Sequence, residues 1–238
     1  MQNKEKRQYK KPWSILLIIL LLIIVGLAIS FGIYVFYLTK NINDENISPR
    51  DLLTQLQSSE KYELNFSGEN NYWLGAAKPK ITIFEFADFN CPLCKKSFSK
   101  IREISLNYKD NVKIIYKDFP VIANSVDLAM AGRCAGEQDL FWPMHDKLFQ
   151  NQGNFNPAKT EEIIAIAKKA GVNINKFSSC LSQKKYLEDI QKDYADGLAI
   201  GTNGTPTWLI NGYKINGDIP YETFIQIIGE LIKNYDSN

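Results

Sequence analysis

The stretch ITIFEFADFNCPLC, residues 81–94, decides the fold, because a strand within it leads directly into a pair of cysteines. Residues 81–86 are rich in β-branched and aromatic side chains on both faces, a pattern typical of a strand buried inside a sheet. Cys91 and Cys94 follow, three residues apart, at the start of a helical pattern that continues to about Tyr108. The sequence therefore places two thiols at the N-terminus of a helix that begins where a central strand ends.

A second strand follows this helix at residues 112–116, VKIIY. Strand, helix and strand within about 35 residues predict a βαβ unit whose two strands are parallel. Asn211-Gly212 is a strong hairpin dipeptide and lies between two further strands. We expect one α/β domain with an all-helical insertion at about residues 122–200. The other expected elements are helices at 126–149 (broken near Pro143), 157–170 and 175–200 (one helix or a pair), strands at 207–210 and 213–216, and an amphipathic helix at 220–233.

The position of the cysteine pair suits redox chemistry. Unpaired N–H groups and the helix dipole favour a thiolate at Cys91, and Pro92 is tolerated in a first turn, where its missing N–H would be unpaired anyway. The spacing places Cys94 on the same helix face, so that it can close a disulfide and resolve a mixed disulfide. Two other interpretations are weaker. A zinc site with four cysteine ligands usually pairs two CxxC motifs, and a purely structural disulfide in so small a ring constrains little.

Residues 14–38 are 25 consecutive residues without a charge, mostly Ile, Leu, Val and Phe. As a helix they would span ~37 Å, enough to cross a hydrocarbon core of ~30 Å. Five Lys and Arg residues precede them and mixed charges follow, so the positive-inside rule places the basic segment 1–13 in the cytoplasm and the rest outside. The alternative is a cleaved signal peptide, whose apolar region normally has ~7–15 residues. The length of the apolar segment favours a retained transmembrane signal anchor.

Residues 39–72 are polar and form a predicted linker, with one short helix beginning at Ser48-Pro49. The folded domain is expected at residues 73–238. Its charges are mixed along the chain, and the net charge of +2 offers no argument for binding nucleic acid. No cofactor and no metal are implied.

Glu85 shares one face of the strand at 81–86 with Ile81 and Ile83. A buried carboxylate is costly unless it has a purpose, which makes Glu85 a candidate catalytic residue. The alternative is a glutamate that reaches solvent or pairs with a lysine such as Lys117.

The other two cysteines, Cys134 and Cys180, both fall in the helical insertion, 46 residues apart. Outside the cytoplasm they are expected to pair as a structural disulfide, and closing such a loop contributes ~4 kcal/mol in the chain-entropy model. A second redox shuttle would lack a CxxC motif, and two free thiols are the remaining alternative. His145, the only histidine, is expected to be a packing or surface residue. A Cys–His hydrolase would need a nucleophile with a base beside it, and the CPLC motif explains Cys91 better.

The chain resembles the DsbA-like thiol–disulfide oxidoreductases, in the branch that includes the Gram-positive BdbD enzymes. The resemblance covers residues 73 to about 235 and implies a thioredoxin fold. It rests on four stretches: EFADFNCPLC at 85–94, YKDFP at 116–120, FWPMHDKLF at 141–149 and GTNGTPTWLING at 201–212.

This resemblance implies roles for individual residues. Pro206 is expected to be a cis-proline facing the cysteines, where the backbone of Thr205 pairs with an extended substrate peptide and reads main chain rather than sequence. Without the resemblance, Thr-Pro would be an ordinary turn at a strand edge. Glu85 matches the buried acidic residue that handles the proton of the second cysteine. Leu93 departs from the Pro-His dipeptide of the best-known oxidases, which removes one source of thiolate stabilisation.

Three functions remain open from the sequence. The first is a tethered dithiol oxidase that takes electrons from unfolded exported proteins with free thiols. For this function the resemblance implies re-oxidation by a quinone-linked membrane partner of the DsbB or VKOR type. The second is a reductase or isomerase, although residues 41–72 are too short for the dimerisation domain of DsbC- or DsbG-type isomerases. The third is a peptide-binding module with vestigial cysteines, against which the combination of Glu85, both cysteines and Thr205-Pro206 argues.

Overall fold

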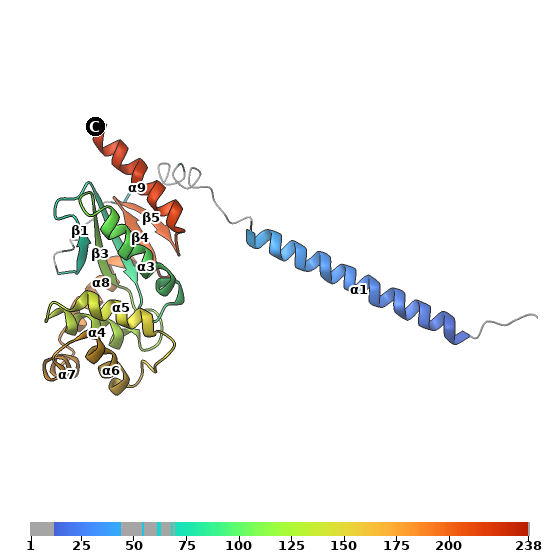
Figure 1. The fold of residues 1–238 in the computed structure, drawn as a ribbon, viewed down its shortest axis with the longest axis horizontal. Coiled ribbons are helices and arrows are strands. Elements are labelled where there is room, and N and C mark those ends of the chain that lie inside the picture. Colours follow the sequence, from blue (N-terminus) through green and yellow to red (C-terminus); the bar gives the residue numbers. More distant parts are fainter. Residues whose placement is uncertain (1–11, 44–53, 55–60, 63–67, 69, 238) are drawn as a thin grey trace, which may run out of the picture. The chain divides into compact units, whose positions relative to one another are not determined.

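The computed structural model describes residues 12–43, 54, 61–62, 68 and 70–237, and the chain divides into two units, residues 1–48 and 49–238. In the first unit a continuous helix, α1, spans Pro12–Asn43 (Figure 1). Its segment Leu16–Tyr34 has 19 residues and a mean hydropathy of 3.2. By length and composition this helix can cross a membrane, although a signal sequence meets the same criteria. Most of the basic segment and the short helix expected at Ser48 lie outside the described residues.

The second unit is built on a five-stranded sheet in the order β1-β3-β2-β4-β5 (Figure 1). β2 and β3 are parallel and are joined by α3 (Pro92–Asn107), which confirms the predicted βαβ unit. The other three neighbouring pairs are antiparallel. The hairpin after β4 turns at Asn211 and Gly212, whose positive φ angles of 47° and 93° suit a two-residue turn. The strands are β1 (Trp73–Gly75), β2 (Ile81–Ala87), β3 (Val112–Asp118), β4 (Thr207–Ile210) and β5 (Tyr213–Asn216).

The insertion between β3 and β4 consists of five helices, of which α4 to α7 gather beyond one end of the sheet (Figure 1). The helix break predicted near Pro143 is wrong, because α4 ends at Gly136 and α5 begins at Phe141. Pro143 thus lies in the first turn of α5, where a missing N–H needs no partner. The chain turns instead at Asp139, which has a positive φ of 59°. The helices are α4 (Ser125–Gly136), α5 (Phe141–Asn151), α6 (Thr160–Ala170), α7 (Ile174–Ser182) and α8 (Leu187–Ala199).

The two faces of the sheet bury different apolar clusters. On one face, Ile83 and Trp208 pack with residues of α3 and of the closing helix α9 (Tyr221–Asp236). On the other face, Phe84 packs in a cluster that Tyr194 of α8 covers. Because β2 is covered on both faces, it carries apolar side chains at consecutive positions instead of alternating ones.

The end of the predicted linker packs on this domain. The backbone N–H of Tyr62 donates to the turn between β4 and β5 at 2.9 Å. Asn71 donates to the carboxylate of Asp193 at 2.7 Å, and Tyr72 stacks on Phe141 with ring centroids 3.9 Å apart. These residues therefore lie with the folded domain, ahead of its predicted first residue.

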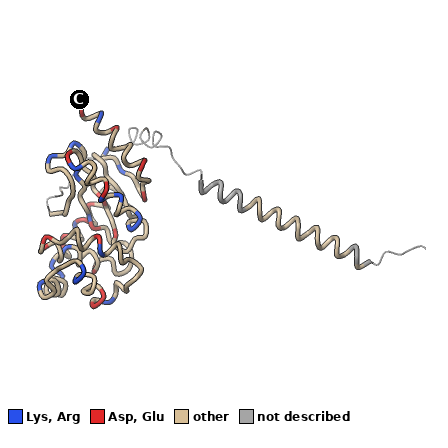
Figure 2. Tube along the Cα trace, in the orientation of Figure 1, with Lys and Arg blue, Asp and Glu red and all other residues tan. Residues whose placement is uncertain are grey.

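A buried cluster of charges joins the insertion to the sheet. Asp193 of α8 pairs with Lys117 of β3 at 2.9 Å and also with Arg133 of α4. Arg133 in turn pairs with Asp118 at 2.6 Å, and all four side chains are at most 3% exposed. The mutual pairing offsets the large cost of taking these charges out of water. Over the rest of the domain, charges of both signs are interspersed along the chain (Figure 2).

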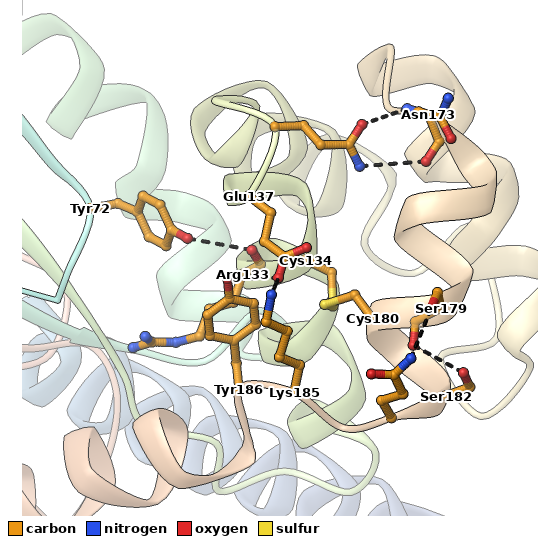
Figure 3. Close-up of a disulfide and its surroundings, with 12 residues drawn as sticks. Tyr72, Arg133, Cys134, Glu137, Asn173, Ser179, Cys180, Ser182, Lys185 and Tyr186 are labelled. Atoms are coloured by element: carbon orange, nitrogen blue, oxygen red, sulfur yellow. Dashed lines mark hydrogen bonds and ion pairs between the residues drawn. A yellow bond between two sulfur atoms is a disulfide. The ribbon is translucent and has the colours of Figure 1, made fainter.

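A disulfide between Cys134 of α4 and Cys180 of α7 ties two helices of the insertion together (Figure 3). Both cysteines are buried. Beside them, Glu137 forms an ion pair with Lys185 and accepts a hydrogen bond from the hydroxyl of Tyr186 at 3.0 Å (Figure 3). Because Cys134 and Cys180 are bonded to each other, neither can join Cys91 and Cys94 as a ligand of a shared zinc ion.

We expect the double variant Cys134→Ala/Cys180→Ala to have a lower free energy of unfolding than the wild type. The bond closes a loop of 46 residues, and its loss should cost up to ~4 kcal/mol. Urea unfolding of the full chain in detergent, followed by circular dichroism, measures the change. An unchanged midpoint with an unchanged urea slope would contradict a stabilising role.

Candidate active site

Cys91 is the N-cap residue of α3, with an extended backbone at φ −79° and ψ 124°. It is 7% exposed, whereas Cys94, one helical turn further on, is completely buried. The hydrogen bond with the Cys94 thiol, helped by the backbone N–H groups of Leu93 and Cys94, lowers the pKa of Cys91 from 9.0 to about 5. Burial raises the pKa of Cys94, and the hydrogen bond to Cys91 raises it further. The pair thus consists of one thiolate and one thiol at neutral pH.

The loop before β4 lies against Cys91. The peptide bond between Thr205 and Pro206 is cis, and Cys91 Sγ lies 3.2 Å from the carbonyl oxygen of Thr205, to which Cys91 donates when it is protonated. This loop is positioned by the antiparallel pairing of Thr207 with Phe86, close to the end of β2. The sheet therefore brings together two predicted parts of the site that are 114 residues apart in the sequence.

Glu85 lies in β2 with only 1% of its surface exposed, in register with Tyr116 of β3 and Trp208 of β4. Neither carboxylate oxygen has a hydrogen-bond partner among the described residues. Burial raises the pKa of Glu85 to about 8, and a charge on Glu85 in turn raises the pKa of Cys94. Lys117, the alternative partner considered from the sequence, points to the other face of β3 and bonds to two aspartates of α8 at 2.9 and 2.8 Å. Glu85 is therefore a buried carboxylic acid within electrostatic range of Cys94.

Asp88 organises the loop between β2 and α3, a role that the sequence analysis missed. Its buried carboxylate accepts hydrogen bonds from the backbone N–H groups of Asn90 at 2.7 Å, Val121 at 2.8 Å and Ile122 at 2.9 Å. It also accepts one from the hydroxyl of Ser125, at the start of α4. The local bond to the backbone of Asn90 closes an Asx turn, which aspartate side chains commonly form. The other bonds join the cysteine loop to the insertion.

Gln152, just after α5, braces the same loop from the other side. Its side-chain amide donates to the carbonyl oxygens of Phe89 at 2.9 Å and Cys91 at 3.0 Å. Its own backbone carbonyl accepts a hydrogen bond from Lys95 of α3 at 2.8 Å. A glutamine at the end of a helix carries no sequence signal for such a role, so only the fold reveals it.

His145 of α5 is completely buried among aromatic rings. Its Nδ1 lies 2.9 Å from a carboxylate oxygen of the neighbouring Asp146, and burial lowers its pKa. Among the described residues its polar contact is with Asp146 and not with Cys91, so they form no Cys–His pair of the hydrolase type. Six aromatic rings surround it with centroids 4.9 to 6.4 Å away: Phe89, Phe98, Tyr116, Phe141, Trp142 and Phe149.

A protein-family model described as Thioredoxin matches residues 67–230, which include the whole sheet, both CPLC cysteines and the insertion. The chain belongs to the thioredoxin family.

Solved structures of related fold agree with this assignment. BdbD from Bacillus subtilis is 22% identical with a TM-score of 0.61, covering 74% of this chain and 100% of that protein. Wolbachia pipientis alpha-DsbA1 is 22% identical with a TM-score of 0.65, covering 73% and 96%. A periplasmic thioredoxin-like protein from Salmonella enterica serovar Typhimurium is 25% identical with a TM-score of 0.60, covering 77% and 97%. The thioredoxin fold with a helical insertion and the resemblance to DsbA-like proteins are thereby confirmed.

Curated relatives match stretches of about 150 residues. The Na(+)/H(+) antiporter NhaA 1 of Salinispora arenicola is 27% identical over 151 residues, which are 62% of this chain and 22% of the antiporter. The antiporter NhaA of Herminiimonas arsenicoxydans is 23% identical over 154 residues, 65% of this chain and 24% of that protein. This chain thus spans less than a quarter of the length of these two relatives.

We expect the thiolate of Cys91 to titrate with a midpoint near pH 5. Because the folded-state pKa is lowered, Cys91 stabilises the dithiol form fully above its unfolded pKa of about 9, and this contribution is lost as the pH falls through about 5. The ultraviolet absorbance of the thiolate in the reduced full chain measures the transition, and the Cys91→Ser variant should lack it. A wild-type midpoint near pH 9 would show that the helix terminus does not stabilise the thiolate.

A Glu85→Gln substitution should stabilise the protein increasingly as the pH rises from about 4.5 to above 8. The folded-state pKa of Glu85 is raised, so its favourable contribution is present below about 4.5 and is lost as the pH rises through about 8. Urea unfolding at both ends of this pH range, with Cys91→Ser in both proteins to remove the thiol titration, measures the difference. A difference that stays constant with pH would mean that Glu85 does not titrate as a buried acid.

Proposed function

We propose that this protein is a membrane-anchored, extracytoplasmic dithiol oxidase that introduces disulfides into exported proteins. The observation that carries this proposal is the asymmetric thiol pair, in which Cys91 has a lowered pKa at a helix N-terminus and Cys94 is a buried thiol. The fold of DsbA-like proteins supports thiol–disulfide oxidoreductase chemistry in general, and this pair supports the oxidising direction.

The proposed reaction begins with the Cys91–Cys94 disulfide. A substrate thiolate attacks Cys91 Sγ, the bond between the two cysteines breaks, and Cys94 leaves as a thiolate that takes a proton from Glu85. A second substrate thiolate then attacks the substrate sulfur of the mixed disulfide. Cys91 leaves as a thiolate, and the substrate leaves with a new disulfide. Two electrons have passed from the substrate to the cysteine pair.

The low pKa of Cys91 favours this direction. A stabilised thiolate is a good leaving group, and it lowers the free energy of the dithiol form relative to the disulfide. Glu85, with a pKa of about 8, is protonated at neutral pH and can supply the proton that Cys94 needs when it leaves.

Thr205 and Pro206 are the proposed contact for substrates. The carbonyl of Thr205 already lies 3.2 Å from Cys91 Sγ, so a chain that pairs with this backbone would bring its own cysteine to the reactive sulfur. Such a contact recognises the peptide backbone of the substrate and not particular side chains. This suits unfolded exported proteins with free thiols as a substrate class.

We further propose that α1 is a retained signal anchor, with the basic residues before it in the cytoplasm and the redox domain, including Tyr62, Asn71 and Tyr72, outside. This arrangement keeps the domain beside a quinone-linked membrane re-oxidase of the DsbB or VKOR type. Its support is the apolar length of the helix and the excess of basic residues before it.

A tethered reductase is the second candidate, and one observation favours it. Leu93, between the two cysteines, is apolar and 46% exposed, so it adds no positive charge beside the Cys91 thiolate.

The reduction potential of the cysteine pair decides between the two candidates. We expect the full chain in detergent, equilibrated with glutathione buffers, to show a value near about −120 mV, as strong oxidases do. A value near about −270 mV, as for thioredoxin, would instead support the reductase. The Cys91→Ser variant, which has no dithiol pair, is the control. Unchanged activity of this variant in the cell would point to a non-enzymatic peptide-binding role.

A further inference from the structure

Three buried side chains carry polar atoms that have no hydrogen-bond partner among the described residues. They are the carboxylate oxygens of Glu85, the hydroxyl of Tyr116 and Nε2 of His145. The three side chains are at most 1% exposed. Buried polar groups without a partner are rare because each one is costly, so three of them in one apolar cluster call for a function.

The fold places these groups next to one another in a fixed order. Glu85 of β2 and Tyr116 of β3 are register partners, so their side chains leave the same face of the sheet. The ring of Tyr116 meets that of His145 at 90° with centroids 5.4 Å apart. Cys94, whose pKa responds to charge on Glu85, lies at the inner end of this series.

The outer end of the series reaches the surface. Nδ1 of His145 lies 2.9 Å from Asp146, whose side chain is 23% exposed. The other carboxylate oxygen of Asp146 pairs with Arg102 of α3 at 3.3 Å. The remaining described neighbours of His145 are aromatic rings. Within the described contacts, Asp146 is therefore the group through which a proton could pass from His145 to solvent.

We propose that Tyr116 and His145 form a proton route that connects Glu85 to Asp146 and hence to solvent. The proposal rests on the function proposed above and deepens it, because it assigns two positioning residues to the proton-transfer step at Cys94.

The step that needs this route is re-oxidation of the dithiol form. The Cys91 thiolate attacks an external disulfide, one thiolate leaves, and a mixed disulfide forms on Cys91. Cys94 must then lose its proton to Glu85 before it attacks Cys91 Sγ and expels the second external thiolate. Since Glu85 is itself protonated at neutral pH, its own proton has to leave the protein interior first.

Both relay groups are in the protonation state that such a transfer requires. Burial raises the pKa of Tyr116 far above its ordinary value and lowers the pKa of His145, so both stay neutral. A neutral phenol can accept a proton and donate another, and a neutral imidazole can accept at Nε2 and release at Nδ1. The route requires side-chain motion or a bridging solvent molecule between neighbouring polar atoms during transfer.

The charges that face these groups come from several elements. Arg102 of α3 and Asp146 of α5 act on His145. The groups that act on Tyr116 are Asp118, Glu85, Cys94 and Asp88. The variants below leave all of these groups in place.

The test is the reaction of the reduced full chain, in detergent, with glutathione disulfide at pH 7. Acid quenching and mass spectrometry separate the two steps, namely formation of the glutathione mixed disulfide on Cys91 and its resolution by Cys94. We expect Tyr116→Phe and His145→Phe each to slow resolution about tenfold while mixed-disulfide formation stays within about twofold. The slowing of resolution should become smaller as the pH rises through about 8, because Glu85 is then already ionised and has no proton to release.

Tyr72→Phe is the matched control. Tyr72 belongs to the same aromatic region, where it stacks on Phe141, but its hydroxyl bonds to the carbonyl of Arg133 and lies outside the route. Tyr116→Phe removes a single oxygen atom from a ring that stays packed, so the test remains decisive even if His145→Phe fails to fold.

Each outcome has a distinct meaning. Slow resolution in Tyr116→Phe with a normal first step and a normal Tyr72→Phe control supports the route. Resolution at the wild-type rate in Tyr116→Phe overturns the route but leaves the proposed function standing. Equal slowing in Tyr72→Phe also overturns it, because the effect would then be one of packing. A wild-type protein that forms no Cys91–Cys94 disulfide overturns the proposed function itself, and the route with it.

Discussion

The pairing of β2 with β3 on one side and with β4 on the other is the constraint on which the candidate site depends. Because β2 has a neighbour on each side, its end faces both the loop after β3 and the loop before β4. One strand thus fixes three groups far apart in the sequence, namely Glu85 within it, Cys91 after it and Thr205 before β4. A shift of one residue in the register of β2 would turn Glu85 to the opposite face, among the phenylalanines, and the site would be lost.

Two ionisable side chains of neighbouring strands show how burial alone does not decide function. Lys117 is 1% exposed, but its ammonium group is held by Asp193 and Asp196 at 2.9 and 2.8 Å. Its charge is neutralised in place, and the cluster it belongs to joins α8 to the sheet. Glu85 is equally buried, has no hydrogen-bond partner among the described residues and lies close to Cys94. The paired charge serves the fold, whereas the unpaired acid, whose pKa burial raises to about 8, is the group that we propose for proton transfer.

The sequence predicted β2 to β5, the hairpin at Asn211-Gly212 and the helix that begins at the cysteines, because these depend on local periodicity and turn chemistry. It did not predict the short strand β1 (Trp73–Gly75). It did not predict the bonds of Asp88 to the loop after β3, the bracing by Gln152 or the buried partners of Asp193. These bonds join residues 33 to 76 positions apart, and no local pattern records such pairs. The misplaced break in the insertion has a related cause, since a proline in a first turn looks the same in sequence as one that ends a helix.

The insertion contributes directly to the difference between the two thiols. Cys91 and Cys94 belong to the same apolar cluster as Leu148 and Phe149 of α5, so the insertion helps to keep water from this side of the site. Exclusion of water raises the pKa of Cys94, whereas the hydrogen bond with the Cys94 thiol, helped by N–H groups of the helix terminus, lowers the pKa of Cys91. A bare βαβ unit would supply the helix terminus but not this cover. The asymmetry of the pair therefore depends both on the helix terminus, which brings the two thiols within hydrogen-bond distance, and on the cover that buries Cys94 more deeply than Cys91.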